Sequence, residues 1–233
     1  MQFLEKNTIK EKICDWLMIG MRSCIHCESF LVRKSLLCYF CESKLFSLSC
    51  SEGLYHHFEH QVSCFSLLSW ERDQNIILNR LIPNLKGKRQ RKAWSYFAKL
   101  IAYELSRQSP RTLGFSLNEE LLIVPCPSRK KVNDHAFFLA QGLSEELKVP
   151  LVKTMEFGKF NSESKKMKRA DRLAIQKLTL SKVESEKPLI HNKANITVLF
   201  VDDVITTGAT LKAANLLHKE YKNFIAISLA FRR

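Results

Sequence analysis

One segment near the C-terminus, Ile196–Thr210, constrains the fold of this chain more than any other feature. It begins with an apolar, β-branched run, Ile-Thr-Val-Leu-Phe-Val, which suits a central strand covered on both faces. Asp202 and Asp203 follow, and the loop Thr206–Thr210 (Thr-Thr-Gly-Ala-Thr) leads into a helical pattern. This order predicts a strand and helix of a parallel α/β sheet, with the polar residues at the carboxyl end of the strand.

The polar residues of this segment have the chemistry to bind a phosphorylated sugar. Carboxylates accept hydrogen bonds, so Asp202 and Asp203 suit the two hydroxyl groups of a vicinal diol. Gly208 lets the backbone approach an anion, the threonines around it supply hydroxyl donors, and the first N–H groups of the helix add further donors. A ribose 5-phosphate fits both the acid pair, through its diol, and the loop, through its phosphate. The alternative is a plain turn followed by a helix cap, which the ordered combination of all four parts disfavours.

The pattern of the remaining chain extends the α/β interpretation. Residues 71–107 show helical periodicity, residues 50–70 predict irregular structure or a hairpin, and residues 6–20 predict a short amphipathic helix. In the second half, strand and helix patterns alternate, which favours a parallel sheet. The expected strands are Leu121–Pro125, Leu151–Met155, Ile196–Asp202 and Phe224–Phe231, and the expected helices are 134–147 and Ala209–Tyr221.

Two C-x₂-C pairs predict a metal site in the first half. They are Cys24 with Cys27 and Cys38 with Cys41. Each pair brings two thiolates onto one turn, and two pairs complete a tetrahedral shell for structural zinc, with no open position for catalysis. Bound zinc would supply folding energy to a module too small for a core of its own.

A second, looser set of metal-ligating residue types follows these pairs. Its spacing allows two interpretations, a second metal site or surface histidines beside buried thiols, and the second is favoured. The set is Cys50, His56, His60 and Cys64.

The charge balance indicates anionic partners. Lys and Arg number 37 against 23 Asp and Glu, a net charge of +14, and such a field favours a pyrophosphorylated sugar, a nucleotide or a nucleic acid. The N-terminal residues alternate charged and apolar side chains, so no secretory signal is expected. No stretch approaches the roughly 20 apolar residues of a membrane span. A cytoplasmic protein with reduced cysteines is therefore the expectation.

The segment Val198–Thr210 resembles the 5-phosphoribosyl-1-pyrophosphate (PRPP) binding motif of type I phosphoribosyltransferases. Together with the four cysteines, it makes the chain similar to the ComF family. Two shorter matches, Leu85-Lys86-Gly87 and Val124–Pro127, agree with that family's leucine-lysine step and proline-x-proline strand end. The resemblance implies a type I phosphoribosyltransferase-like parallel sheet with helices on both faces (71–233), preceded by an N-terminal helix and zinc module (1–70).

The resemblance also implies roles for particular residues. Asp202 and Asp203 would contact the ribose hydroxyls and take part in any catalysis. Mg²⁺ would accompany PRPP, held largely by the ligand. Arg129 and Lys131 follow the strand end near which the pyrophosphate would bind. The residues that would hold the 5-phosphate are Ile205, Thr206, Thr207, Gly208, Ala209 and Thr210.

Two segments depart from the family pattern. Lys131–His135 retains a basic residue but lacks the expected glycine and amide pair, and Lys165–Arg172 lacks the expected glutamine. Both would lie over the pyrophosphate, so ligand binding is expected more firmly than catalysis.

The expected function is a competence protein for DNA uptake that binds PRPP and single-stranded DNA and works with an uptake helicase or channel protein. Lys86–Lys92 contains five cations and is the expected DNA contact, with phosphate-directed binding. Trp94, Tyr96 and Phe97 follow it, and an exposed ring there would stack on bases, although the helical spacing of Trp94 and Phe97 favours the core. The alternative is an active phosphoribosyltransferase of nucleotide metabolism or salvage, whose acceptor the sequence does not name.

Overall fold

The structure is a computed structural model of the 233-residue chain. It describes residues 23–29, 36–48, 54–57, 62–71, 76–86, 91–128, 134–157, 178–180 and 193–232, and the statements below concern these residues.

A five-stranded sheet forms the centre of the molecule. Its order is β1-β2-β7-β6-β3. The strands β2, β7, β6 and β3 run parallel to their neighbours, and β1 pairs antiparallel with β2 as a hairpin. A separate antiparallel pair joins β4 to β5. The bounds are β1 Leu54–His57, β2 Ser63–Trp70, β3 Leu121–Pro125, β4 Met155–Phe157, β5 Leu178–Leu180, β6 Thr197–Ile205 and β7 Asn223–Arg232.

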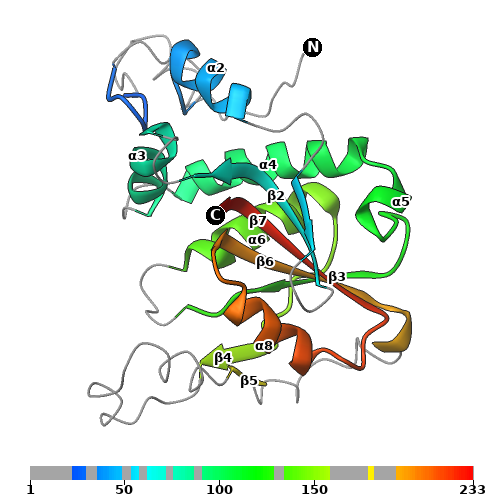
Figure 1. Ribbon diagram of the computed structural model, residues 1–233. Coiled ribbons are helices and arrows are strands. Elements are labelled where there is room, and N and C mark those ends of the chain that lie inside the picture. The colour runs from blue at the N-terminus through cyan, green and yellow to red at the C-terminus, as the bar shows by residue number, and fades with distance from the viewer. Residues whose placement is uncertain are drawn as a thin grey trace, which may run out of the picture.

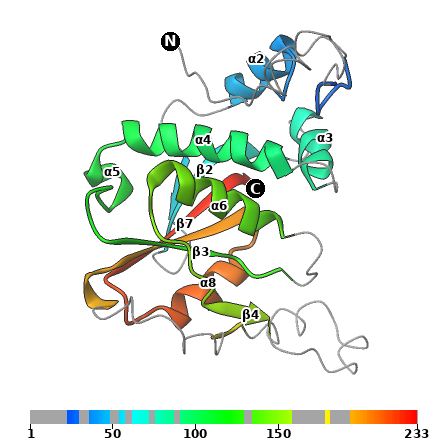
Figure 2. The same ribbon diagram turned by 180° about the vertical axis from the view of Figure 1, so that it is seen from behind.

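Helices cover both faces of this sheet (Figures 1 and 2). Helices α4 and α6 lie against each other on one face, and α8 lies on the opposite face beside β4 and β5. Helices α2 and α3 contact each other at one end of α4. The bounds are α2 Tyr39–Leu48, α3 Ile76–Leu85, α4 Arg91–Arg107, α5 Pro110–Leu113, α6 His135–Leu147 and α8 Ala209–Leu217. None of the helices in the described ranges is long and apolar enough to cross a membrane.

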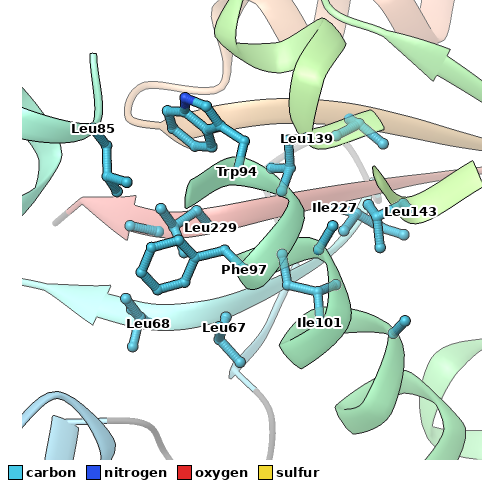
Figure 3. Packing of buried hydrophobic residues seen from close by; sticks show 14 of the residues in the cluster. Leu67, Leu68, Leu85, Trp94, Phe97, Ile101, Leu139, Leu143, Ile227 and Leu229 are labelled. Carbon is cyan, nitrogen blue, oxygen red and sulfur yellow. The ribbon is translucent and has the colours of Figure 1, made fainter. Parts of the chain in front are cut away.

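Alternation along the strands divides the core into two layers, because successive side chains of a strand point to opposite faces. On the α4/α6 side, Phe97 and Ile101 pack with Leu139 and Leu143 over Leu229 of β7 (Figure 3). On the α8 side, the packed residues include Phe200, Phe224 and Leu211. Burial on both faces of the sheet therefore explains why apolar residues occupy successive positions in β6 (Val198–Val201) and β7 (Phe224–Ile227).

Most of the expected elements are present. The strands β3, β6 and β7, the helices α6 and α8, and the helices α3 and α4 within residues 71–107 confirm the sequence pattern. The strands β1 and β2 pair as the hairpin that was one of two interpretations of residues 50–70. The expected strand Leu151–Met155 is wrong: it forms only a bridge, Ile123 to Leu151, and the strand β4 begins at Met155. The expected N-terminal helix over 6–20 lies outside the described residues.

The proposed division at residue 70 remains a prediction. The strands β1 and β2 precede it in the chain, and β2 pairs with β7 along most of its length. The central sheet therefore draws residues from both sides of that division. The cysteine pairs and α2 are the part of the 1–70 segment that lies outside the sheet.

Close contact between α4 and α6 predicts that residue 142 must remain small. A Cβ atom on Gly142 would lie 2.7 Å from Cβ of Ala98 and 3.3 Å from Cα of Ser95. Gly142→Leu should therefore force the two helices apart and lower the unfolding free energy by about 3 kcal/mol, or roughly 6–12 °C in Tm. Gln141→Leu, on the exposed side of the same helix, is the control for thermal unfolding. Equal Tm values for the two variants would contradict this packing.

Candidate ribose-phosphate site and cysteine module

The acid pair lies near the carboxyl end of β6, where two neighbouring strands also end. The Asp202 carboxylate accepts a hydrogen bond from the backbone N–H of Asp203 at 2.8 Å, and the Asp203 carboxylate accepts one from Val204 at 2.7 Å. Each acid is thereby fixed by the next peptide group, leaving acceptor positions on the other carboxylate oxygens. Strand alternation turns the two side chains to opposite faces of the strand. Two carboxylates so arranged can accept hydrogen bonds from a diol across the end of the strand.

Lys86 binds the second of these acids. Its Nζ lies 2.7 Å from Oδ2 of Asp203, whose side chain is 14% exposed. This residue directly follows α3, far from the acid pair in sequence. The first residue of the run Lys86–Lys92, which sequence predicted as a DNA contact, therefore lies at the acid pair. Sequence reasoning missed this contact, and the only signal for it was the match of Leu85-Lys86-Gly87 to the ComF pattern.

The loop after β6 has the geometry of an anion site. Gly208 adopts a left-handed conformation, φ 69°, and is the residue from which α8 begins. The Gly208 carbonyl accepts the N–H of Lys212 at 2.8 Å, so the first N–H groups of the helix have no partner within it. Thr206 and Thr207 are exposed, Thr210 is half-buried and Ile205 is buried against the core. The loop can therefore offer both backbone and hydroxyl donors to a phosphate.

Burial dominates the electrostatics around the acid pair. It raises the pKa of Asp202 to about 8, with a further rise from the negative charge of Asp203, while Lys86 lowers it. Burial also raises the pKa of Cys126, and the two aspartates add to that rise. Burial lowers the pKa of His135. The negative charge of Asp203 raises this pKa, and the positive charge of Lys86 lowers it. Cys126 and His135 therefore lie close enough to the acid pair for its charge to affect their ionisation.

A buried polar row continues from the acid pair across the sheet. Asp202 is the register partner of Ser228 on β7, and Ser228 is the partner of Ser66 on β2. The two serine hydroxyls are 2.7 Å apart and fully buried. The thiol of Cys64 lies 3.6 Å from Ser66 Oγ, and its pKa rises to about 12 because of burial. Cys64, Ser66 and Ser228 provide hydrogen-bonding partners for one another inside the sheet core. This polar row beside the acid pair was not predicted from the sequence.

The remaining residues predicted for the pyrophosphate are not described. Arg129 and Lys131 lie outside the described residues, as does all of Lys165–Arg172. Of the other segment that departs from the ComF pattern, Lys131–His135, only Asp134 and His135 are described. Their roles at the site remain predictions. The preceding strand end, Pro125-Cys126-Pro127, adjoins the acid pair because Pro125 is the register partner of Val201.

The four predicted cysteines come together. Their Sγ atoms all lie within 4.8 Å of one another, and those of Cys27 and Cys38 are 3.7 Å apart. A tetrahedral ion with Zn–S bonds of about 2.3 Å requires sulfur atoms about 3.8 Å apart. In addition, the ring Nδ1 of His26 lies 3.2 Å from the sulfur of Cys41, a contact typical of a ligand held from outside the shell. The cluster can therefore bind a metal ion.

The structure describes only part of the second set of possible metal ligands, Cys50, His56, His60 and Cys64. His56 is the register partner of Cys64 across the β1–β2 hairpin. Cys50 and His60 lie outside the described residues. A second metal therefore stays a hypothesis, and Cys64 itself is buried and in contact with Ser66.

The aromatic residues after the basic run are mostly core residues. Trp94 and Phe97 are 1% and 0% exposed, and the Tyr96 hydroxyl donates to Glu42 of α2 at 2.6 Å. Base stacking on Trp94 or Phe97 is thereby excluded. Tyr39 and Phe40, inside the second cysteine pair, are instead 78% and 77% exposed.

The raised pKa of Asp202 predicts a pH-dependent stability. The folded state holds a proton that the unfolded chain releases near pH 3.9, so the unfolding free energy falls as pH rises from there to about 8. Asp202→Asn removes this loss. Its advantage over the wild type in unfolding free energy, followed as a Tm difference, should grow between pH 5 and pH 8, by at most about 1.4 kcal/mol per pH unit. Glu145→Gln, an exposed carboxylate on α6, is the control; a pH-independent difference for Asp202→Asn would contradict the burial of this acid.

Comparisons with known proteins find similarity over the part of the chain that contains the acid pair and the loop. The phosphoribosyl transferase domain family matches residues 118–232, the range that contains β3, the acid pair and the loop. Competence protein F of Haemophilus influenzae is 28% identical over 214 residues, which cover 84% of this chain and 90% of that protein. The similarity to the ComF family is thereby confirmed.

Two phosphoribosyltransferases are among the solved structures that resemble this chain. A hypoxanthine phosphoribosyltransferase of Staphylococcus aureus is 16% identical with a TM-score of 0.37, covering 60% of this chain and 64% of its own. This chain thus spans just under two thirds of that enzyme. A purine phosphoribosyltransferase of Pyrococcus horikoshii is 17% identical with a TM-score of 0.36, covering 59% of this chain and 84% of its own.

Proposed function

Because the chain is similar to a competence protein F and its residues 118–232 match the phosphoribosyl transferase domain family, we propose that it binds PRPP at the end of β6. The observation that carries this proposal is the acid pair followed by the left-handed Gly208 at the start of α8. Asp202 and Asp203 accept the two ribose hydroxyls. Residues Ile205–Thr210 hold the 5-phosphate with backbone and hydroxyl donors. Arg129 and Lys131 would approach the pyrophosphate, and Mg²⁺ held largely by the ligand would neutralise part of its charge.

Two sugar phosphates smaller than PRPP test whether the acid pair binds the ribose hydroxyls while the loop binds the phosphate. Ribose 5-phosphate contains both the diol and the phosphate, whereas 2-deoxyribose 5-phosphate lacks one hydroxyl. In thermal unfolding, ribose 5-phosphate should raise the Tm at millimolar concentration and the deoxy sugar should raise it much less. A buried acceptor left without its donor costs about 1–3 kcal/mol, so the affinities should differ by about tenfold. Equal stabilisation by the two sugars would contradict diol recognition by the acid pair.

The four cysteines hold zinc in this proposal. Four thiolates fill a tetrahedral shell completely, so the ion is structural and supplies folding energy to the module around α2. The residues that hold it are Cys24, Cys27, Cys38 and Cys41.

The biological role that we propose is DNA handling during natural transformation, as the name of the Haemophilus relative suggests. The net charge of +14 favours a polyanionic partner, and an uptake helicase or channel protein is a candidate protein partner. Work inside the cytoplasm suits the chemistry of PRPP and of reduced thiolates. Single-stranded DNA would bind the basic residues that follow Lys86.

Salt dependence tests the DNA part of the proposal. Neutralising Lys88, Arg89 and Arg91 should lower the slope of log affinity against log salt by roughly 0.7 for each DNA phosphate that these side chains neutralise in the wild type. The matched control neutralises three exposed cations on other elements, Arg111, Lys148 and Lys219. Fluorescence anisotropy with labelled single strands is the measurement, and equal slopes for the two triple variants would contradict a DNA contact at 88–91.

A second candidate function is active phosphoribosyl transfer, favoured by the domain match over 118–232. The reaction would replace pyrophosphate on the sugar C1 by a nitrogen nucleophile and release the pyrophosphate. Release of pyrophosphate from PRPP on addition of a nucleobase, lost in Asp203→Asn, would support this function; PRPP binding with no turnover for any base would contradict it.

A further inference from the structure

The end of helix α3 makes two polar contacts with parts of the molecule that are distant in sequence. Asn84 donates from Nδ2 to the backbone carbonyl of Ile25, inside the first cysteine pair, at 2.7 Å. Two residues later, Lys86 forms its 2.7 Å ion pair with Asp203. One helix end thus contacts both the metal-binding module and the acid pair.

The link between the two contacts is short and buried. Leu85, which separates Asn84 from Lys86, is fully buried and packs in the same cluster as Trp94 and Leu229 (Figure 3). The backbone N–H of Lys86 is bonded to carbonyls of the last helical turn. A displacement of Asn84 therefore moves Lys86 with it, because close-packed interiors transmit shifts.

Other contacts fix α3 and the module against the sheet domain. The indole N–H of Trp70, at the end of β2, donates to Asn79 of α3 at 2.8 Å. Tyr96 of α4 donates to Glu42 of α2 at 2.6 Å. On the open side, His26 and Cys27 line a hollow together with Arg80 and Asn84. The first cysteine pair therefore faces α3 directly.

A cation is needed at the acid pair for an electrostatic reason. Burial and the neighbouring charge favour the protonated form of Asp202, which Lys86 opposes. A protonated carboxyl loses acceptor capacity toward a diol. Lys86 also adds positive charge where an anionic ligand would bind. The titratable and charged groups that face the pair are Cys64 in β2, Lys86 directly after α3, Cys126 directly after β3, and Asp134 and His135 at the start of α6.

We propose that Lys86 is a positioning residue for the acid pair, and that Asn84 couples its position to the cysteine module through the end of α3. The proposal rests on the proposed function, since the ligand of the acid pair is the ribose of PRPP. It gives the cysteine module a role in ligand binding as well as in folding. Removing the hydrogen bond from Asn84 to the module should then weaken PRPP binding, and only as long as Lys86 is present.

A double-mutant cycle tests this coupling. Calorimetric titration of Mg²⁺ and PRPP would be compared for the metal-loaded wild type, Asn84→Ala, Lys86→Met and the double variant. Lys86→Met should weaken binding about tenfold, the usual loss for a charged hydrogen-bonding partner. Asn84→Ala should weaken it about fivefold. The double variant should bind no more weakly than Lys86→Met, because both changes act through one contact.

Three further measurements separate positioning from general damage. The pH at which binding is half-maximal should rise in Lys86→Met, since the acid pair needs a higher pH to ionise without its cation. Lys86→Arg should restore both affinity and pH profile. Lys99→Met, which removes an exposed cation of α4, should change neither. Should Asn84→Ala lose its metal, Asn84→Ser takes its place in the cycle.

The outcomes are distinct. Wild-type affinity in Asn84→Ala, or additive losses in the double variant, would overturn the coupling while leaving PRPP binding intact. An unchanged pH profile in Lys86→Met would overturn the positioning role. Absence of PRPP binding by the wild type would overturn the proposed function and this inference with it.

Discussion

Cys41→Ser is expected to abolish metal binding and unfold the cysteine module. The Cys41 thiol is buried and belongs to the four-sulfur cluster. Structural zinc in such small modules contributes about 10–16 kcal/mol of binding energy that is also folding energy. A shell with three sulfurs loses much of it, and among the described side chains of α2 only Cys41 and Leu45 are buried. Metal analysis should find one zinc per wild-type chain and almost none in the variant, with a loss of helical circular dichroism.

Cys64→Ser is the matched control for this variant. Cys64 is also buried, but it lies in β2 beside Ser66. The control should retain one zinc per chain. Retention of full metal content by Cys41→Ser would contradict the four-cysteine site. Two zinc ions in the wild type and one in Cys64→Ser would instead support the second set around His56.

Gly208→Val is expected to lower PRPP affinity by about 100-fold or more. The φ of 69° at Gly208 is a conformation that costs a β-branched residue more than the 1–2 kcal/mol of an ordinary side chain. The loop would relax out of this conformation, and its N–H groups would no longer point toward one phosphate position. Calorimetric titration measures the loss directly.

Gly114→Val separates loop strain from loss of the ligand site. Gly114 also has a left-handed φ, 74°, at the end of α5. Its carbonyl accepts from Asn223, the first residue of β7, so it lies at the end of the sheet opposite the acid pair. This variant should lose comparable stability but retain PRPP affinity. Similar losses of affinity in both variants would contradict a phosphate site at Gly208.

The candidate site could be predicted where its residues are local in sequence. The acid pair, Gly208 and the start of α8 lie within one strand-loop-helix unit, whose residue types and order determine its geometry. The cysteine pairs could be predicted for the same reason, since identical C-x₂-C spacing reflects a shared ligand geometry.

Contacts between distant segments could not be predicted in this way. Lys86 belongs to a basic run that suggests a solvated surface, and only the packing of Leu85 in the core brings its ammonium group to Asp203. The hairpin of β1 and β2 contains mixed polar and aromatic residues, and its place beside β7 depends on tertiary pairing. The buried serines Ser66 and Ser228 gave no sequence signal, because a polar residue in a strand usually indicates an exposed face.

Calorimetric titration of PRPP with Mg²⁺ into the zinc-loaded protein tests the central claim most directly, beside the double variant Asp202→Asn/Asp203→Asn. Asparagine preserves side-chain size but replaces an acceptor oxygen with a donor. The expected result is a dissociation constant of roughly 1–100 µM for the wild type, in the range of ordinary substrate sites, and no measurable binding by the double variant. Absence of binding by the wild type, or equal binding by both proteins, would contradict a ribose-phosphate site at the end of β6.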